Sequence, residues 1–191
     1  MSLPDRVIAI DWSGAKDIRS CRRKIYLAAY GVNGLQDLRS GRTREEVCNL
    51  LIEESKRNPN LVVGLDFAFS FPSQFIQEKC CGNISEFWDC AQREGKQWLD
   101  KKPSPFFTKG SPHKNAFRAT EEKLSKEQRL HPETVFRLVG QRQVGRGSVR
   151  GMPLLGRLQR EGFKIWPFDP PEMPLVVEIY PRLFYGKVSK S

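Results

Sequence analysis

The chain lacks long hydrophobic runs. Nowhere in its 191 residues is there the uninterrupted apolar stretch of about 18 residues that a membrane-spanning helix needs. Residues 1–14 turn acidic and polar too early for a signal peptide. The five cysteines form no CxxC pair, and the two histidines have no second ligand at zinc spacing. These absences favour a cytoplasmic protein with reduced thiols and no membrane partner.

Familiar catalytic motifs are also missing. No serine or cysteine stands in a GxSxG-type motif, and no histidine–acid dyad is visible. Residues 139–151 are rich in Gly and Arg, but they do not match a P-loop, because Arg146 and Gly147 stand where Lys and Ser/Thr are required. We interpret this stretch as a flexible, solvated loop; an anion-binding loop is the alternative.

Positive charge is unevenly distributed. The net charge is +10, yet residues 1–92 hold 12 basic and 12 acidic side chains, whereas residues 93–191 hold 20 basic and 10 acidic ones. A one-sided basic surplus is typical of a surface that binds a polyanion such as DNA or RNA. The alternative is a basic protein without such a partner.

The hydrophobic pattern predicts alternating strands and helices. We expect a helix that starts with the capping box at Thr43 and ends at Pro59, further helical segments within 73–99 and 120–130, and a helix over 152–161. The expected strands cover 7–10, 24–30, 35–38, 61–65, 163–166 and 175–180. This order predicts an α/β domain in which a mixed sheet has helices on both faces. We expect a single domain over 1–191, with a basic insertion at about 100–150.

Three carboxylates stand at or within the most apolar strands. Asp11 follows VIAI, Asp66 follows LVVGL, and Glu178 lies within PLVVEIYP. An ionised carboxylate beside buried surface is costly unless it is paired, hydrogen-bonded or bound to a metal. Their similar placement predicts a shared site for Mg²⁺ or Mn²⁺, which prefer oxygen ligands and can activate water for phosphodiester hydrolysis. Alternatively, each acid caps a turn or pairs with an arginine.

Several basic residues are candidates for nucleic-acid contact. Lys16 follows Ser13 and Gly14 in a turn that suits a phosphate, although it also fits an ordinary β-turn. Phe106, Phe107 and Phe117 lie among basic residues, where aromatic rings can stack on unpaired bases, but at least one of them is expected in the core. The candidate contacts are Lys16, Lys109, Lys114, Arg118, Arg142, Arg146 and Arg150.

Four segments together resemble one known family. They are IAIDWSGAKD, GLDFAFSFP, SVRGMPLLGRLQREGFKIWPFD and VVEIYPRLFYG, and the likeness runs from about Val7 to Tyr185. The chain is similar to the domain of unknown function 429 family, described as predicted nucleases with a ribonuclease-H-like fold. The resemblance implies that fold, a metal-dependent nuclease activity, and acidic motif positions at Asp11, Asp66 and Glu178. The opening hairpin, the helix and the buried parallel strand expected above also fit the ribonuclease-H-like layout.

One feature departs from that pattern. Ribonuclease-H-like nucleases usually add a carboxylate from a helix after the last core strand, and residues 182–191 contain no acid. The expectation is therefore a truncated chain, a site built on three carboxylates, or a protein without catalysis. Two other functions stay open: a nucleic-acid-binding module without catalysis, and a phosphotransferase of the actin-like and sugar-kinase type that uses the Asp11-x-x-Gly14 turn for phosphate.

Overall fold

The computed structural model of the chain describes residues 3–79, 81–106, 116–128, 131–139 and 143–183. Its internal contacts divide the chain into two compact units. We call them the sheet unit (Met1–Ser13, Asp17–Phe67 and Glu161–Ser191) and the helical unit (Gly14–Lys16 and Ala68–Arg160). The expectation of a single domain with an insertion stays a prediction; the helical unit covers a longer stretch than the 100–150 segment.

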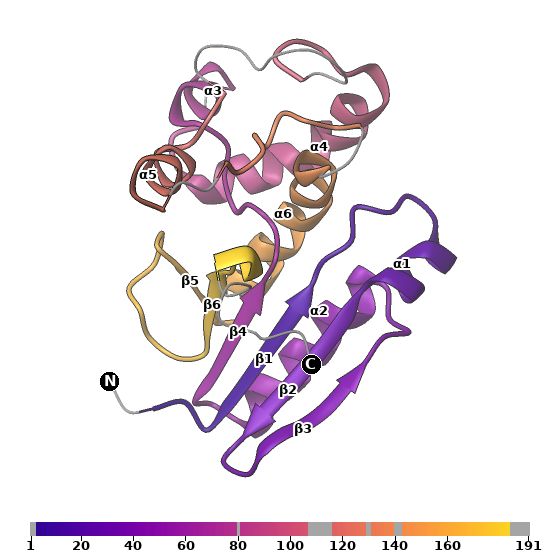
Figure 1. Ribbon diagram of the computed structural model, residues 1–191, viewed down its shortest axis with the longest axis vertical. Helices are drawn as coiled ribbons and strands as arrows, with labels where there is room; N and C mark the ends of the chain where they lie inside the picture. The colour runs from indigo at the N-terminus through magenta and orange to yellow at the C-terminus, as the bar shows by residue number, and fades with distance from the viewer. Residues whose placement is uncertain (1–2, 80, 107–115, 129–130, 140–142, 184–191) are drawn as a thin grey trace. The chain divides into compact units, whose positions relative to one another are not determined.

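The sheet unit contains a six-stranded mixed sheet (Figure 1). Its elements are β1 (Arg6–Asp11), α1 (Ile18–Lys24), β2 (Tyr26–Gly31), β3 (Gly34–Arg39), α2 (Arg44–Arg57), β4 (Leu61–Leu65), β5 (Lys164–Trp166), β6 (Leu175–Glu178) and the 3₁₀ turn η1 (Pro181–Leu183). The strand order is β3-β2-β1-β4-β6-β5. Strand β2 is antiparallel to both of its neighbours, whereas β1, β4, β6 and β5 pair in parallel.

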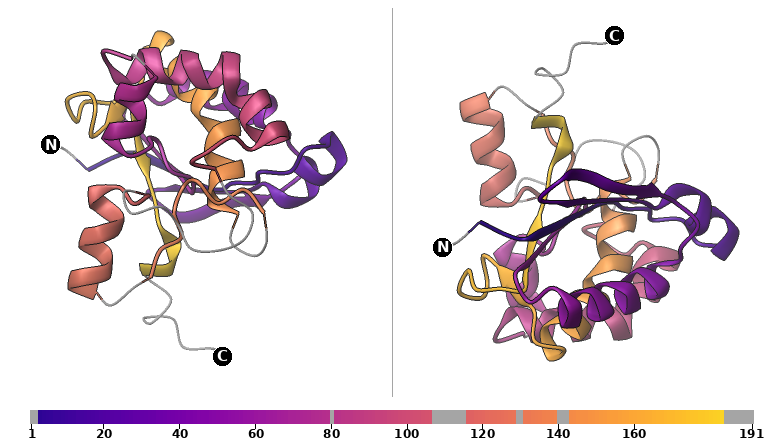
Figure 2. Two further views of the ribbon diagram at one scale, coloured as in Figure 1. Left: turned by 90° about the horizontal axis from the view of Figure 1, so that it is seen from above. Right: turned by 90° about the horizontal axis from the view of Figure 1, so that it is seen from below.

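One face of this sheet is buried and the other is more open. Across the ladders, Ile8 pairs with Ala29 and Val63, and Val63 pairs with Val176; all four are at most 1% exposed. Helix α2 lies along this face (Figure 2) and buries an apolar stripe of its own, Val47, Cys48, Leu51 and Ile52. Because strand side chains alternate between faces, the intervening residues of the strands occupy the other face.

Local signals explain both helices of the sheet unit. Thr43 caps α2 through the amide of Glu46, and the Glu46 carboxylate accepts a hydrogen bond from the amide of Thr43 at 2.7 Å, which completes the capping box. Asp17 caps α1 by accepting from the amide of Ser20 at 2.8 Å. The sequence analysis expected α2 but missed α1, because its seven residues carry almost no apolar periodicity.

The helical unit is built from α3 (Ser73–Glu78), α4 (Ile84–Lys101), α5 (Ala119–Gln128) and α6 (Val144–Arg160). Six aromatic rings form its core, with neighbouring centroids 5.2 to 6.2 Å apart: Phe71, Phe75, Phe87, Trp98, Phe106 and Phe136. Phe106 is thus a core residue, one of the two roles considered for it. Helices α4 and α6 pack closely, because Gly95 presents no side chain and an added Cβ would lie 2.9 Å from Cγ1 of Val149.

The predicted α/β class with a mixed sheet is confirmed, and one local interpretation is wrong. The Gly- and Arg-rich stretch is not a flexible loop from residue 144 onward, because α6 begins there rather than at Met152. Its glycines permit close packing: an added Cβ at Gly145 would collide with the carbonyl oxygen of Val135. No helix in the described ranges is long and apolar enough to cross a membrane.

Candidate functional site

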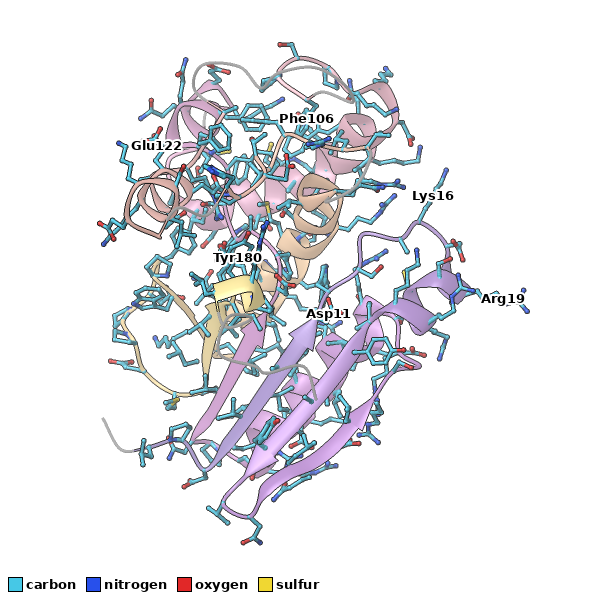
Figure 3. The ribbon with its side chains drawn as sticks, in the orientation of Figure 1. Asp11, Lys16, Arg19, Phe106, Glu122 and Tyr180 are labelled. Carbon is cyan, nitrogen blue, oxygen red and sulfur yellow. The ribbon has the colours of Figure 1, made fainter. Side chains whose placement is uncertain are left out.

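The three candidate carboxylates meet at one end of the sheet unit. Strands β1, β4 and β6 are parallel neighbours, so their carboxyl ends share one edge of the sheet. Asp11 is the last residue of β1, Asp66 directly follows β4, and Glu178 is the last residue of β6. Figure 3 labels Asp11 at the tip of β1, with Arg19 of α1 and Tyr180 at the same end of the sheet.

Asp11 and Asp66 leave the sheet side by side. The residues that precede them, Ile10 and Leu65, are register partners, and the amide of Asp66 donates to the carbonyl of Ile10 at 3.1 Å. On its other side, Asp11 lies opposite Tyr26 in the antiparallel ladder. The buried neighbours fix the backbone of both acids, so their placement follows from the core of the sheet.

Glu178 lies near Asp11 and Asp66, but in the pairing of β6 with β4 it is one residue out of step with Asp66. It pairs with Leu65, whereas Ile179 is level with Asp66 because the amide of Ile179 donates to the carbonyl of Leu65 at 3.0 Å. Side chains alternate along a strand, so Glu178 points to the side of Leu65. Ile179 covers Gly64, where an added Cβ would lie 2.8 Å from Cγ2 of Ile179.

Two aromatic residues lie next to the paired acids. Trp12 follows Asp11, Phe67 follows Asp66, and their ring centroids are 4.9 Å apart. Phe67 is 5% exposed. The indole nitrogen of Trp12 is buried and has no hydrogen-bond partner among the described residues. The two rings thus pack against each other directly after the paired acids in the sequence.

The electrostatics of the site disfavour three negative charges. Desolvation, followed by the nearby charges of Asp11 and Glu178, raises the pKa of Asp66 to about 6. Desolvation also raises the pKa of Asp11, although this side chain is itself solvent-accessible. Within the described ranges, neither aspartate side chain has a hydrogen bond or an ion pair. Among the residues that the structure describes, the pair therefore has no compensating cation.

The positions of the three acids decide which of them could bind the same metal ion. Among the described residues, no group of three or more His, Cys, Asp or Glu side chains is arranged to hold one metal ion. Asp11 and Asp66 are paired carboxylates with free oxygen atoms, which suits a hard divalent cation. Glu178 is near enough to act on their charge but, by register, is not a third equivalent ligand.

Four of the residues predicted to bind nucleic acid fall in the described ranges, and all four belong to the helical unit. Lys16 is exposed, Arg146 donates to Gln143, and Arg150 donates to the carbonyl of Gly14. Arg118 is largely buried, and its Nε lies 2.8 Å from Oε1 of Glu121. Lys109, Lys114 and Arg142 lie outside the described residues, as does Phe107.

The turn after Asp11 is occupied by protein atoms. Gly14 lies against α6, and a Cβ added there would stand 2.7 Å from the amide nitrogen of Gly147. Its carbonyl oxygen already accepts the hydrogen bond from Arg150. The phosphotransferase that would use this turn for phosphate stays a prediction.

The sequence analysis missed a basic cluster within the sheet unit. Helix α1 carries Arg22, Arg23 and Lys24 in its last turn and Arg19 in its first. Residues 1–92 are neutral as a whole, so averaging over that half concealed four basic residues within seven positions. The N-cap signal of Asp17, followed by basic residues in the final turn, was the available clue.

Comparison with known proteins adds no further assignment. No protein-family model, curated protein or solved structure matches this chain.

Proposed function

We propose that the chain is a metal-dependent nuclease that hydrolyses phosphodiester bonds at the carboxyl ends of β1, β4 and β6. The observation that carries the proposal is the side-by-side pair Asp11 and Asp66, which has no cationic partner within the described ranges. Like charges on adjacent strand ends raise the free energy of the ionised site, and a divalent cation would offset that repulsion.

The proposal includes membership of the domain of unknown function 429 family and a ribonuclease-H-like fold. Its support is the β2–β3 hairpin, followed by α2 and by a buried β4 that is parallel to β1. This is the layout that the sequence resemblance implies. The three acids at the shared strand edge correspond to the acidic motif positions of that family.

The proposed roles follow from position. Asp11 and Asp66 would hold Mg²⁺ or Mn²⁺ through carboxylate oxygens. When bound, such an ion supplies an activated water and neutralises charge on the phosphate. Glu178, one register position away, orients the attacking water or completes the site. Partial burial desolvates both aspartates, which strengthens their interaction with a cation.

A cleavage assay with matched variants tests the proposal. Wild-type protein is incubated with end-labelled single-stranded and duplex DNA and RNA, in Mg²⁺, Mn²⁺ or EDTA. We expect metal-dependent cleavage that Asp11→Asn and Asp66→Asn each reduce by about 100-fold or more, whereas Glu178→Gln has a smaller effect. Glu53→Gln, an exposed acid of α2, is the control and should retain full activity.

Metal binding provides an independent measurement. Mn²⁺ should raise the melting temperature of the wild type and of Glu53→Gln, because a ligand that binds only the folded state stabilises it. Asp11→Asn should show little or no such shift. EDTA-resistant cleavage shared equally by the wild type and Asp11→Asn would reveal a contaminating nuclease and refute the metal mechanism.

A nucleic-acid-binding module without catalysis is the second candidate. The register of Glu178 and the lack of a three-ligand group among the described residues favour it. It predicts salt-dependent, largely sequence-independent binding without cleavage. Retained binding together with inactivity in every metal would select this second function.

A further inference from the structure

The open face of the sheet unit carries exposed tyrosines beside Asp11. Tyr26 is 47% exposed and lies directly opposite Asp11, and Tyr30 is 45% exposed on the same strand. Tyr30 follows Tyr26 by four positions of extended strand, which separates equivalent atoms of the two by about 13 Å. Both side chains leave the same face, because their positions differ by an even number. Large aromatic rings so exposed are available to a ligand.

The neighbouring residues extend this surface. Val7 pairs with Tyr30, Ala9 with Ala28, and Ala28 with Leu38, so small and aliphatic side chains fill the face between and beside the rings. A register shift between β2 and β3 pairs Leu35 with Tyr30, which brings Leu35 to the same face as Leu38. The result is an apolar platform on β1, β2 and β3 that ends at Asp11.

The basic residues of α1 lie at the same end of the sheet unit. Helix α1 ends at Lys24, two residues before Tyr26, and Figure 3 shows Arg19 at the Asp11 end of the sheet. Arg19, Arg23 and Lys24 are exposed, and within the described ranges their side chains have no hydrogen bond or ion pair. Arg22 instead ties α1 to the loop before α2 through the carbonyl of Gly41 at 2.8 Å. The helix is thus anchored while three of its cations face solvent.

We propose that this surface binds single-stranded nucleic acid, with unpaired bases stacked on Tyr26 and Tyr30 and phosphates neutralised by Arg19, Arg23 and Lys24. The inference rests on the proposed function and names the substrate class of that site. Basic side chains complement the charge of a phosphate backbone, and aromatic rings accept any base through its π-face. The cross-strand neighbour of Asp11 is Tyr26, so a base on this ring brings its phosphodiester toward the acids.

The spacing of the tyrosines favours a single strand over a duplex. Neighbouring bases in a duplex lie about 3.4 Å apart and cover one another's faces. Rings about 13 Å apart on a strand cannot enter such a stack, but they can each take a separate, unpaired base. A duplex would therefore contact only the cations of α1 and would lose the stacking contribution.

Binding is tested with the full chain in EDTA, so that cleavage cannot occur. Fluorescence anisotropy measures the affinity for labelled 15-nucleotide dT and U strands and for a duplex of equal length. We expect Tyr26→Ala to weaken single-strand binding about 10-fold and Tyr30→Ala somewhat less, while Tyr26→Phe retains affinity because it keeps the ring. Trp166→Ala is the aromatic control, since Trp166 is 49% exposed but lies on β5, four strands from β2.

A charge experiment completes the design. Arg19→Ala combined with Arg23→Ala should weaken binding and reduce the slope of log affinity against log salt by about 1.4, from two lost phosphate contacts on a single strand. Lys56→Ala combined with Arg57→Ala, in the last turn of α2, is the matched control with two exposed cations elsewhere in the sheet unit. Unchanged single-strand affinity in Tyr26→Ala, or tighter binding of the duplex, would overturn the inference.

The two proposals fail in different ways. If Tyr26→Ala loses binding in EDTA but the wild type never cleaves, the surface is as inferred and the nuclease proposal is wrong. If Asp11→Asn abolishes metal-dependent cleavage but both tyrosine variants bind as the wild type does, the nuclease proposal holds and the stacking surface is wrong.

Discussion

Carboxylates in the two units have opposite surroundings. In the helical unit, Glu121 is 4% exposed and accepts hydrogen bonds from the amide and from Nε of Arg118, at 2.6 and 2.8 Å. Glu94 of the same unit binds Lys79 at 2.7 Å, and this hydrogen bond is the main cause that lowers its pKa. In the sheet unit, desolvation and two neighbouring acids raise the pKa of Asp66 to about 6.

The difference separates acids that are paired within their own unit from acids that have no partner within the described ranges. Glu121 and Glu94 each have a base from their own unit, so their charges are compensated once the chain folds. Asp11 and Asp66 have no such partner within the described ranges, and folding brings them together at a cost. A cluster that destabilises its own unit is typical of a functional site.

The largest expected loss of stability follows from removal of Glu121, the buried and paired acid of the helical unit. Glu121→Ala should lower the free energy of unfolding by about 3 kcal/mol, because Arg118 would remain largely buried without its partner. Urea unfolding followed by circular dichroism measures the change. Glu122→Ala, an exposed neighbour on α5, should change stability by less than about 0.5 kcal/mol. Equal effects from the two variants would remove the distinction between the units.

Removing the charge of Asp66 should raise the free energy of unfolding, whereas removing Glu121 should lower it. The folded-state pKa of about 6 lies above the usual aspartate value of 3.8, so the stability linked to protonation of Asp66 is fully present below pH 3.8 and is lost as pH rises through 6. Asp66→Asn should therefore stabilise the metal-free protein at pH 7.5, by about 1–2 kcal/mol after allowance for partial exposure.

Urea unfolding at pH 3.5 and at pH 7.5 checks this prediction. At the lower pH, where Asp66 is protonated in both states, the gain of Asp66→Asn over the wild type should disappear. Glu53→Gln provides the control and should show no comparable gain at either pH. Destabilisation by Asp66→Asn at pH 7.5 would mean that the carboxylate holds the fold, as Glu121 does.

The capping box of α2 tests whether the sheet unit also contains polar pairs that stabilise the fold. Thr43→Ala should cost about 1 kcal/mol, because the amide of Glu46 loses its acceptor. Thr43→Ser keeps a hydroxyl group and should recover most of this stability. Thermal unfolding of the wild type and the two variants ranks their stabilities. A Thr43→Ala variant as stable as the wild type would show that water replaces the cap without penalty.

The smallest expected effect concerns Glu94. Its pKa is lowered from the usual glutamate value of 4.5, so the stability that the Glu94 carboxylate contributes is present above that pH and is lost as pH falls through the folded-state value. Glu94→Gln should cost about 0.5 kcal/mol at pH 7, a modest amount because both partners are partly exposed. The cost should shrink in acid, which is the reverse of the pH dependence expected for Asp66.

Strong local signals made much of the sheet unit predictable. The apolar runs before Asp11 and Asp66 predicted β1 and β4, and the capping box at Thr43 predicted the start of α2. The meeting of the three acids also followed from strand direction. The register of Glu178 could not be predicted, because it depends on how β6 pairs with β4, a long-range contact that no local pattern encodes.

Segments with weak or mixed signals were predicted less well. The glycines of α6 suggested a loop, since glycine disfavours helices, but tertiary packing against α4 outweighs that propensity. Helix α1 was missed because its short, basic sequence forms no apolar stripe. The basic residues of α1 were concealed because residues 1–92 are neutral as a whole.

The register shift between β2 and β3 has a consequence for self-association. Strand β3 is the outer strand beside β2, and its outward backbone groups could template pairing with another chain. The shift between Ala29 and Tyr30 leaves Gln36 out of the regular pairing, and such bulges increase local twist. A twisted, irregular edge is a poor template for a second strand. The same irregularity that brings Leu35 onto the open face thus also protects the protein against edge-to-edge aggregation.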